Sequence, residues 1–210
     1  MCRRHSPETW LVFDETYYQF QMESDRIHFF PNGKVLDYPN IIHIFSFSKT
    51  FGMPGWRVGF LAYPTSLTSA MRKIQDTIPC HAPILSQKLA LACLETYQSD
   101  GRNEWFDQQL AQLRMVREVL WPVLEPLGTV RTAGAFYFLV PLPDGIGEEE
   151  AVDLLAHQYG VLLMTGSPFG APGHLRLSYG SIAPEKVLGC VERLRGGLDE
   201  LQELSRYRKK

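Results

Sequence analysis

The sequence lacks the features that mark several classes of protein. It has four cysteines among 210 residues, and no two of them form a Cys-x-x-Cys pair. Such scattered cysteines are typical of reduced thiols in an intracellular protein rather than of a disulfide framework or a zinc site. No apolar run approaches the roughly twenty residues of a membrane helix, and the run that ends at Asp14 is too short for a signal peptide. We therefore expect no cofactor metal and no membrane segment.

An excess of charge of one sign is also missing. The chain carries 21 Lys and Arg against 23 Asp and Glu, which gives a net charge of -2, and it has no basic stripe. The basic residues at 206–210 are more typical of a solvated terminus than of a binding patch. This balance argues against nucleic acid as a partner. The length and the 45% apolar content allow one large or two small domains with a sizeable core.

The sequence does contain three near-continuous apolar runs, at residues 10–13, 41–47 and 58–63. Runs rich in β-branched and aromatic residues predict strands that are buried on both faces of an α/β sheet. In open α/β sheets, ligands bind outside the carboxyl ends of the strands. Asp14, which directly follows the first run, should therefore lie at the same sheet edge as Lys49, which follows the second.

The connection between the second and third runs carries the most chemistry. The loop Thr50–Trp56 is shorter than the roughly ten to twelve residues of a parallel crossover, so the third strand should return antiparallel. Lys49 and Arg57 would then share one sheet edge with the hydroxyls of Ser46 and Ser48. A lysine amine can form a Schiff base with a carbonyl, and a guanidinium can bind phosphate oxygens in a bidentate way. These groups suit an anionic ligand that carries a carbonyl.

The pattern Ser-x-Ser-Lys-x-x-Gly-x-x-Gly-x-Arg-x-Gly over residues 46–59 resembles the lysine segment of the class I and II aminotransferases. These are fold-type I enzymes that use pyridoxal 5'-phosphate. The resemblance implies that Lys49 binds the cofactor and then moves a proton from the substrate Cα. It also implies that Ser46 and Arg57, together with Ser48, bind the cofactor phosphate.

Two further segments carry this resemblance. Asp14 matches the aspartate that pairs with the pyridine nitrogen of the cofactor, and Tyr17 matches the tyrosine that donates to its phenolic oxygen. Arg176, within Leu-Arg-Leu-Ser-Tyr-Gly, matches the arginine that binds the substrate α-carboxylate. From the residues alone, Asp14 could also cap a strand end, and Arg176 could pair with an internal carboxylate.

The remaining sequence predicts several helices and a second sheet. Helices are expected after Pro64, from Pro83 to about Tyr97, and from Asn103 to Pro122, and the apolar residues of the second should lie in the core. Three acidic residues at 148–150 and a stop at Gly160 predict a fourth helix, and Pro184 precedes the last. Further strands are expected at 135–140, 161–164 and 174–178.

The resemblance implies an α/β fold, the C-terminal part of a fold-type I transferase. Residues 1–122 would form a partial, mixed-sheet cofactor domain, and 123–210 a small α+β domain. Family members are longer at the N-terminus, where a glycine-rich phosphate loop, a ring-stacking aromatic residue and an asparagine reside. We therefore expect a truncated form or fragment. The polar segment 18–40 supports no functional interpretation.

The function implied is an aminotransferase that moves an amino group between an amino acid and a 2-oxo acid, as a homodimer in its full-length form. Segments 73–79 and 86–90 resemble plant-type enzymes that use methionine and aromatic oxo acids. The cytoplasm is the expected location, unless a targeting peptide belongs to missing N-terminal sequence. Two alternatives stay open. One is another fold-type I enzyme, such as a carbon–sulfur lyase or an aminocyclopropane-carboxylate synthase relative; the other is a non-catalytic remnant with a dimerisation role.

Overall fold

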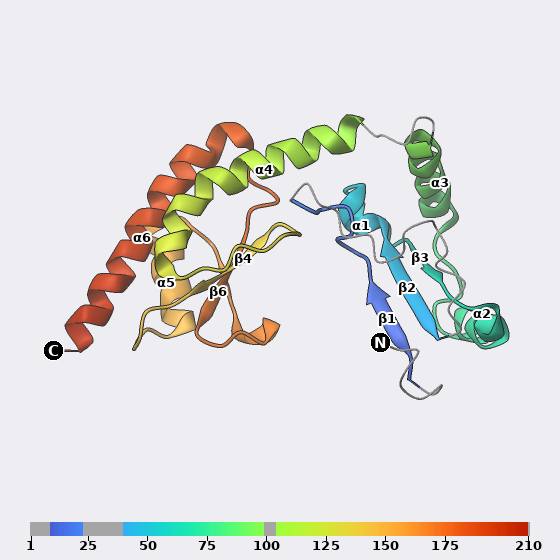
Figure 1. The fold of residues 1–210 in the computed structure, drawn as a ribbon, viewed down its shortest axis with the longest axis horizontal. Coiled ribbons are helices and arrows are strands. Elements are labelled where there is room, and N and C mark those ends of the chain that lie inside the picture. The colour runs from blue at the N-terminus through green and yellow to red at the C-terminus, as the bar shows by residue number, and fades with distance from the viewer. Residues whose placement is uncertain (1–8, 23–39, 99–103, 210) are drawn as a thin grey trace. The chain divides into compact units, whose positions relative to one another are not determined.

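The computed structural model describes residues 9–22, 40–98 and 104–209 (Figure 1). Most of segment 18–40, and Asn103 at the expected start of the long helix, lie outside the described residues. The chain forms two compact units, Met1–Asp107 and Gln108–Lys210, so the division falls inside helix α4. The domain boundary near Pro122 lies in the same helix and stays a prediction.

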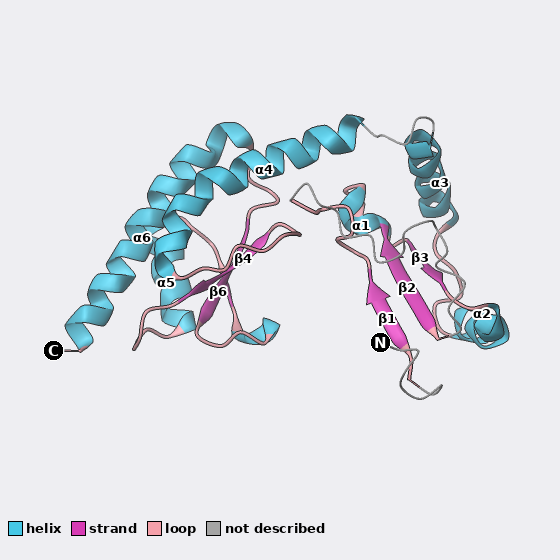
Figure 2. Cartoon of the chain, in the orientation of Figure 1, coloured by secondary structure: helices cyan, strands magenta, loops and turns pink. Residues whose placement is uncertain are grey.

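The first unit contains a sheet of three strands in the order β1-β2-β3 (Figure 2, magenta). The strands are β1 (Leu11–Asp14), β2 (Ile41–Ser46) and β3 (Gly59–Ala62). β1 pairs with β2 in parallel, and Asp14 lies opposite Ile44. β2 and β3 are antiparallel, with Ser46 opposite Gly59, which confirms the predicted return. The ends of β1 and β2 and the start of β3 therefore meet at one sheet edge.

The connection between β2 and β3 begins with a short helix, α1 (Phe47–Thr50). The prediction that the second strand continues to Phe47 is wrong, because Ser46 ends the strand and caps the helix. Its Oγ accepts a hydrogen bond from the backbone N–H of Ser48 at 3.1 Å. A 3-10 turn, Pro54–Trp56, follows before β3. Lys49 is thus held in a helical turn rather than at the last position of a strand.

The expectation that these strands are buried on both faces is wrong for the described chain. Burial alternates along β1, and three of the four residues of β3 are exposed. The two helices that follow are α2 (Thr68–Thr77) and α3 (Ile84–Gln98). α3 packs on α1 through a small core that contains Phe47, Met53, Val58 and Ala90. The expected burial of α3 is only partly right, because Leu85 is 72% exposed while Leu89 packs on this core.

The second unit contains an antiparallel sheet in the order β4-β6-β5. The strands are β4 (Tyr137–Pro141), β5 (Met164–Thr165) and β6 (His174–Ser178). The helices are α4 (Glu104–Leu124), α5 (Glu148–Tyr159) and α6 (Val187–Arg208). The predicted helix start at Glu148 and the stop at Gly160 are confirmed, whereas α4 continues past Pro122 to Leu124. None of the described helices combines the length and apolarity that a membrane span requires.

The two faces of this second sheet differ. Phe138, Val140, Leu175 and Leu177 alternate along β4 and β6 and are all buried. On the opposite face, Leu139 and Met164 are exposed. α5 and α6 lie side by side (Figure 1), and a Cβ atom at Gly197 of α6 would clash with the Leu155 side chain of α5. The buried core of this unit thus lies on one side of the sheet. The other side, which carries the exposed Leu139 and Met164, is called the open face below.

Candidate active site

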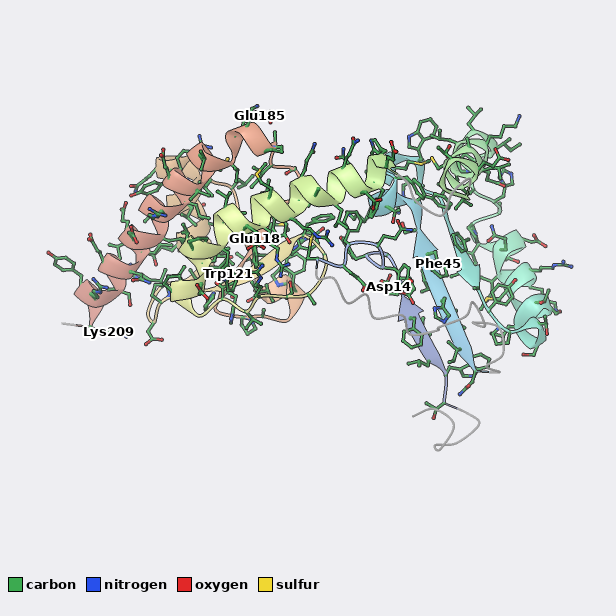
Figure 3. The ribbon with its side chains drawn as sticks, turned by 45° about the horizontal axis from the view of Figure 1, so that its top comes forward. Asp14, Phe45, Glu118, Trp121, Glu185 and Lys209 are labelled. Carbon is green, nitrogen blue, oxygen red and sulfur yellow. The ribbon has the colours of Figure 1, made fainter. Side chains whose placement is uncertain are left out.

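The polar residues predicted from the sequence gather at the sheet edge of the first unit. Asp14 ends β1, and Ser46 ends β2. Lys49 follows in α1, and Arg57 precedes β3. Figure 3 labels Asp14 and Phe45, which lie on the neighbouring strands β1 and β2. The topology therefore brings a carboxylate, an amine, a hydroxyl and a guanidinium to one edge of one sheet.

Lys49 and Tyr17 approach each other closely. Lys49 Nζ lies 5.9 Å from the centroid of the Tyr17 ring. Tyr17 belongs to the turn that follows β1, where the backbone N–H of Phe20 donates to the Tyr17 carbonyl. Both side chains are half-buried. Lys49 forms no ion pair with any residue that the structure describes, so its amine remains available for a ligand.

Asp14 has one oxygen engaged locally. Its Oδ1 accepts hydrogen bonds from the Thr16 N–H at 3.0 Å and the Thr16 hydroxyl at 2.6 Å. This is the capping role that the residues alone allow. Within the described ranges, Oδ2 accepts no hydrogen bond, and the side chain is exposed. The Asp14 carboxylate can therefore cap the strand end through Oδ1 and still accept a hydrogen bond from a ligand through Oδ2.

Arg57 has an unusual backbone. Its φ angle of 49° lies in the left-handed region, which non-glycine residues seldom adopt. The exposed guanidinium donates to the Pro54 carbonyl at 3.1 Å, so the side chain folds back over the 3-10 turn. Strained backbone of this kind is concentrated at functional sites.

The donor set fits a phosphorylated pyridine aldehyde. Lys49 supplies an amine for the aldehyde, Asp14 an acceptor for a protonated ring nitrogen, and Tyr17 a phenol. Ser48 and Arg57 supply donors for a phosphate. No group of three or more His, Cys, Asp or Glu side chains in the described ranges could hold a metal ion.

Arg176 lies on β6 of the second unit. Its guanidinium carbon is 4.0 Å from the centroid of the Tyr137 ring and 4.3 Å from that of Phe169. It forms no ion pair with a described residue, so the alternative of an internal carboxylate partner finds no support there. Phe169 belongs to the segment 165–170, which resembles part of the family's carboxylate-binding segment, whereas the contact with Tyr137 was not predicted from the sequence.

Two carboxylates near these residues were not predicted from the sequence. Glu15 Oε1 lies 3.1 Å from Nδ1 of His43, and His43 is only 1% exposed in the middle of β2. The sequence did offer a signal for this pair, because His43 lies inside the apolar run 41–47 and Glu15 follows shortly after the run 10–13. Glu148 accepts hydrogen bonds from Ser167 and Gly173, and these bonds hold the pKa of its carboxyl below the usual value. No sequence spacing indicated that pairing.

A protein-family model and several curated proteins match most of the chain. The model of aminotransferase class I and II covers residues 1–194. The aromatic aminotransferase ISS1 of Arabidopsis thaliana is 37% identical over 199 residues, which are 91% of this chain and 48% of that protein. The L-glutamine–4-(methylsulfanyl)-2-oxobutanoate aminotransferase of Bacillus subtilis is 29% identical over 70% of this chain and 36% of its own length. The chain thus spans about half, or less, of the length of these relatives.

Solved structures show the same relationship. The aromatic aminotransferase from Pyrococcus horikoshii superposes with a TM-score of 0.76 at 28% identity, covering 91% of this chain and 51% of that one. LysN, an α-aminoadipate aminotransferase from Thermus thermophilus, was solved with N-(5'-phosphopyridoxyl)-L-leucine. It matches with a TM-score of 0.76 at 27% identity, over 93% of this chain and 50% of that one. The chain therefore has the fold of the C-terminal part of a fold-type I aminotransferase, and it belongs to the class I and II aminotransferase family.

Proposed function

We propose that this chain is the C-terminal part of a pyridoxal-phosphate-dependent aminotransferase that moves an amino group between an amino acid and a 2-oxo acid. The observation that carries the proposal is the meeting of Asp14, Tyr17, Lys49 and Arg57 at one sheet edge in a chain of this family. Similarity to relatives named for aromatic amino acids and for 4-(methylsulfanyl)-2-oxobutanoate supports an aromatic or methionine-derived substrate.

The cofactor of this family, pyridoxal phosphate, supplies an aldehyde carbon and a ring that accepts electrons from the substrate Cα. Asp14 Oδ2 would keep the ring nitrogen protonated, because an adjacent carboxylate favours the charged form of that nitrogen. The Tyr17 hydroxyl would donate to the phenolic oxygen. Ser46, Ser48 and Arg57 would bind the phosphate.

Lys49 has two roles in this proposal. Its amine would hold the cofactor through the aldehyde carbon, with loss of water. Once the substrate amine had displaced it, the Lys49 Nζ would accept the proton from the substrate Cα as a general base. Its place in a helical turn beside the Tyr17 ring limits where Nζ can move. Arg176 would bind the substrate carboxylate through its planar donor fork.

The assembly and location belong to the same proposal. The family resemblance supports a homodimer for the full-length protein and a role in amino-acid biosynthesis. The three described cysteines, Cys80, Cys93 and Cys190, are free thiols, which supports a reducing compartment such as the cytoplasm.

The test is covalent labelling of Lys49. The purified chain, mixed with pyridoxal phosphate, should become yellow, and borohydride should fix the cofactor permanently to the peptide that contains Lys49. The Lys49→Ala variant should lose both signals. Lys73 and Lys88 are exposed and provide internal controls for non-specific labelling. Label recovered on Lys73 or Lys88 and not on Lys49 would refute the assignment.

A further inference from the structure

The surroundings of Arg176 are set by strand register. On the open face of the second sheet, Arg176 lies opposite Leu139 of β4 and opposite Met164 of β5. Tyr137, two residues before Leu139, occupies the diagonal position on the same face. The guanidinium therefore stands in the middle of a three-stranded face, and its Nη1 contacts the Met164 sulfur at 3.5 Å.

Two aromatic rings contact this guanidinium. Its carbon lies 4.0 Å from the Tyr137 centroid and 4.3 Å from the Phe169 centroid, both well within cation–π distance. Tyr137 comes from the sheet, whereas Phe169 comes from the connection between β5 and β6. Contacts with ring faces restrict the plane of a guanidinium without occupying its N–H donors. The one described acceptor for these donors is the Met164 sulfur, a weak acceptor. The N–H edge of the guanidinium is the part that binds a carboxylate in a bidentate way.

The position of Phe169 depends on a tightly folded loop. Phe169 ends a 3-10 turn, Ser167–Phe169, and its backbone N–H donates to the Gly166 carbonyl at 2.8 Å. The Gly166 N–H donates to the His174 carbonyl at 2.8 Å, which closes the loop across its ends. A Cβ atom at Gly166 would clash with the backbone oxygens of Ala171 and His174. Only glycine at 166 allows this closure.

Glu148 ties this loop to α5. One carboxylate oxygen accepts from the Ser167 N–H at 3.0 Å, and the other accepts from the Ser167 hydroxyl at 2.8 Å and the Gly173 N–H at 2.6 Å. These partners flank Phe169 on both sides in the sequence. Hydrogen bonds to an ionised acceptor are roughly twice as strong as those between neutral groups. The depressed pKa of Glu148 shows the same preference for the charged form.

We propose that Glu148 and Phe169 are positioning residues for Arg176: Glu148 holds the loop 165–173 against α5, and the loop places the Phe169 ring against the guanidinium. The pre-oriented donor fork then binds a carboxylate with less loss of side-chain freedom. This inference rests on the proposed function of Arg176 as the carboxylate-binding residue.

The experiment compares Glu148→Gln, Phe169→Leu and Arg176→Ala with a matched control, Glu149→Gln. Glu149 is the next residue of α5; it is exposed, and it makes no side-chain hydrogen bond or ion pair within the described part of the chain. The full chain with pyridoxal phosphate is dialysed against labelled 3-phenylpropanoate, and against 3-phenylpropanamide as the uncharged analogue. A second measurement follows the rate at which phenylglyoxal modifies Arg176, read by peptide mapping.

Phe169→Leu and Glu148→Gln should each raise the Kd for the carboxylate by roughly threefold to thirtyfold. Both should also speed the modification of Arg176, while the cofactor absorbance and the binding of the amide stay unchanged. Glu149→Gln should match the unaltered chain in every measurement. Arg176→Ala should abolish the preference for the carboxylate over the amide.

The outcomes separate the two proposals. If Arg176→Ala loses the carboxylate while Glu148→Gln and Phe169→Leu bind and react like the unaltered chain, the positioning role is wrong and the proposed function stands. If the unaltered chain shows no preference for the carboxylate, or Arg176→Ala keeps it, Arg176 does not bind carboxylates, and both its assigned role and the positioning role are wrong. The role of Lys49 is decided separately by the borohydride labelling.

Discussion

Arg117 and Arg176 are both arginines of the second unit, but they serve different purposes. Arg176 presents its donors on an open sheet face, whereas Arg117 of α4 is only 2% exposed. The Arg117 guanidinium donates to the Thr132 carbonyl, and its Nε has no hydrogen-bond partner among the described residues. Nearby, burial raises the pKa of Tyr179 to about 12, and the Arg117 charge opposes that rise. Arg117 therefore holds the segment before β4 against α4.

Arg117→Ala should lower the free energy of unfolding by about 2–5 kcal/mol, because it leaves a cavity in the core of the second unit. Arg117→Met should cost less, since methionine fills much of that volume and removes a buried charge that no described carboxylate neutralises. Urea denaturation of the three proteins measures both effects. Equal destabilisation by the two variants would show that the charge itself is required.

At the scale of elements, the β2–β3 hairpin determines where Lys49 and Arg57 lie. A Cβ atom at Gly59 would approach the Phe45 carbonyl oxygen to 2.5 Å, a contact with backbone that cannot move without breaking the pairing. Gly59→Ala should therefore destabilise the chain by about 1–3 kcal/mol and weaken cofactor attachment at Lys49. Gly55→Ala is the matched control, because nothing lies within 4 Å of its Cβ position. Denaturation and borohydride labelling should show no difference between Gly55→Ala and the unaltered chain; a similar loss in both variants would contradict this account.

The link between α5 and the loop 165–173 should be sensitive to acid. The pKa of Glu148 is lowered in the fold, chiefly by the hydrogen bonds from Ser167, relative to a reference of 4.5. The stabilisation it supplies is therefore fully present above about pH 4.5 and is lost as the pH falls through the lower, folded pKa. The difference in unfolding temperature between the unaltered chain and Glu148→Gln should shrink as the pH falls from 7 to about 3. A difference that stays constant over this range would show that Glu148 does not act through its charge.

At the scale of the whole molecule, many large apolar side chains are exposed in the first unit. They come from all three strands, from α2 and α3 and from the connection between these helices: Val12, Ile44, Phe60, Leu61, Ile74, Ile78, Ile84, Leu85 and Leu91. Nothing among the described residues covers them, and soluble monomers rarely expose large contiguous apolar patches. Among the described strands, β1 and β3 are the two outer strands of their sheet, and outer strands with unpaired backbone groups favour association.

We expect residues 1–210, purified alone, to self-associate and to be a poor catalyst. Proton transfer requires reacting groups to be placed to within a fraction of an ångström, and the chain spans only about half of its relatives. Light scattering should report association, and Leu85→Lys should reduce it, because this leucine is 72% exposed. An assay with pyridoxal phosphate, methionine or tryptophan and a 2-oxo acid should show turnover orders of magnitude below that of a full-length relative. Multiple turnover by a well-behaved soluble dimer would contradict both expectations.

The sequence by itself determined the features that depend on near neighbours in the chain. The loop after Lys49 is too short for a crossover, so the antiparallel return and the shared edge of Lys49 and Arg57 followed from spacing alone. The start of α5 at Glu148 and its left-handed stop at Gly160 are likewise local, because acidic residues in the first turn and a glycine after the last turn act within one turn of the helix. The pattern around Lys49, over residues 46–59, also predicted membership of the aminotransferase family, which the family model confirms.

Only the tertiary structure decided which distant groups meet and which surfaces stay open. Glu148 reaches Ser167 and Gly173 across 19 and 25 residues, and Phe169 reaches Arg176 from a different element. The apolar run at 58–63 predicted a buried strand, yet β3 is mostly exposed. The physical reason is the same in each case. An apolar side chain favours burial, but whether it is buried depends on which elements pack over it. In the same way, the partner of a charged side chain depends on which elements the fold brings together.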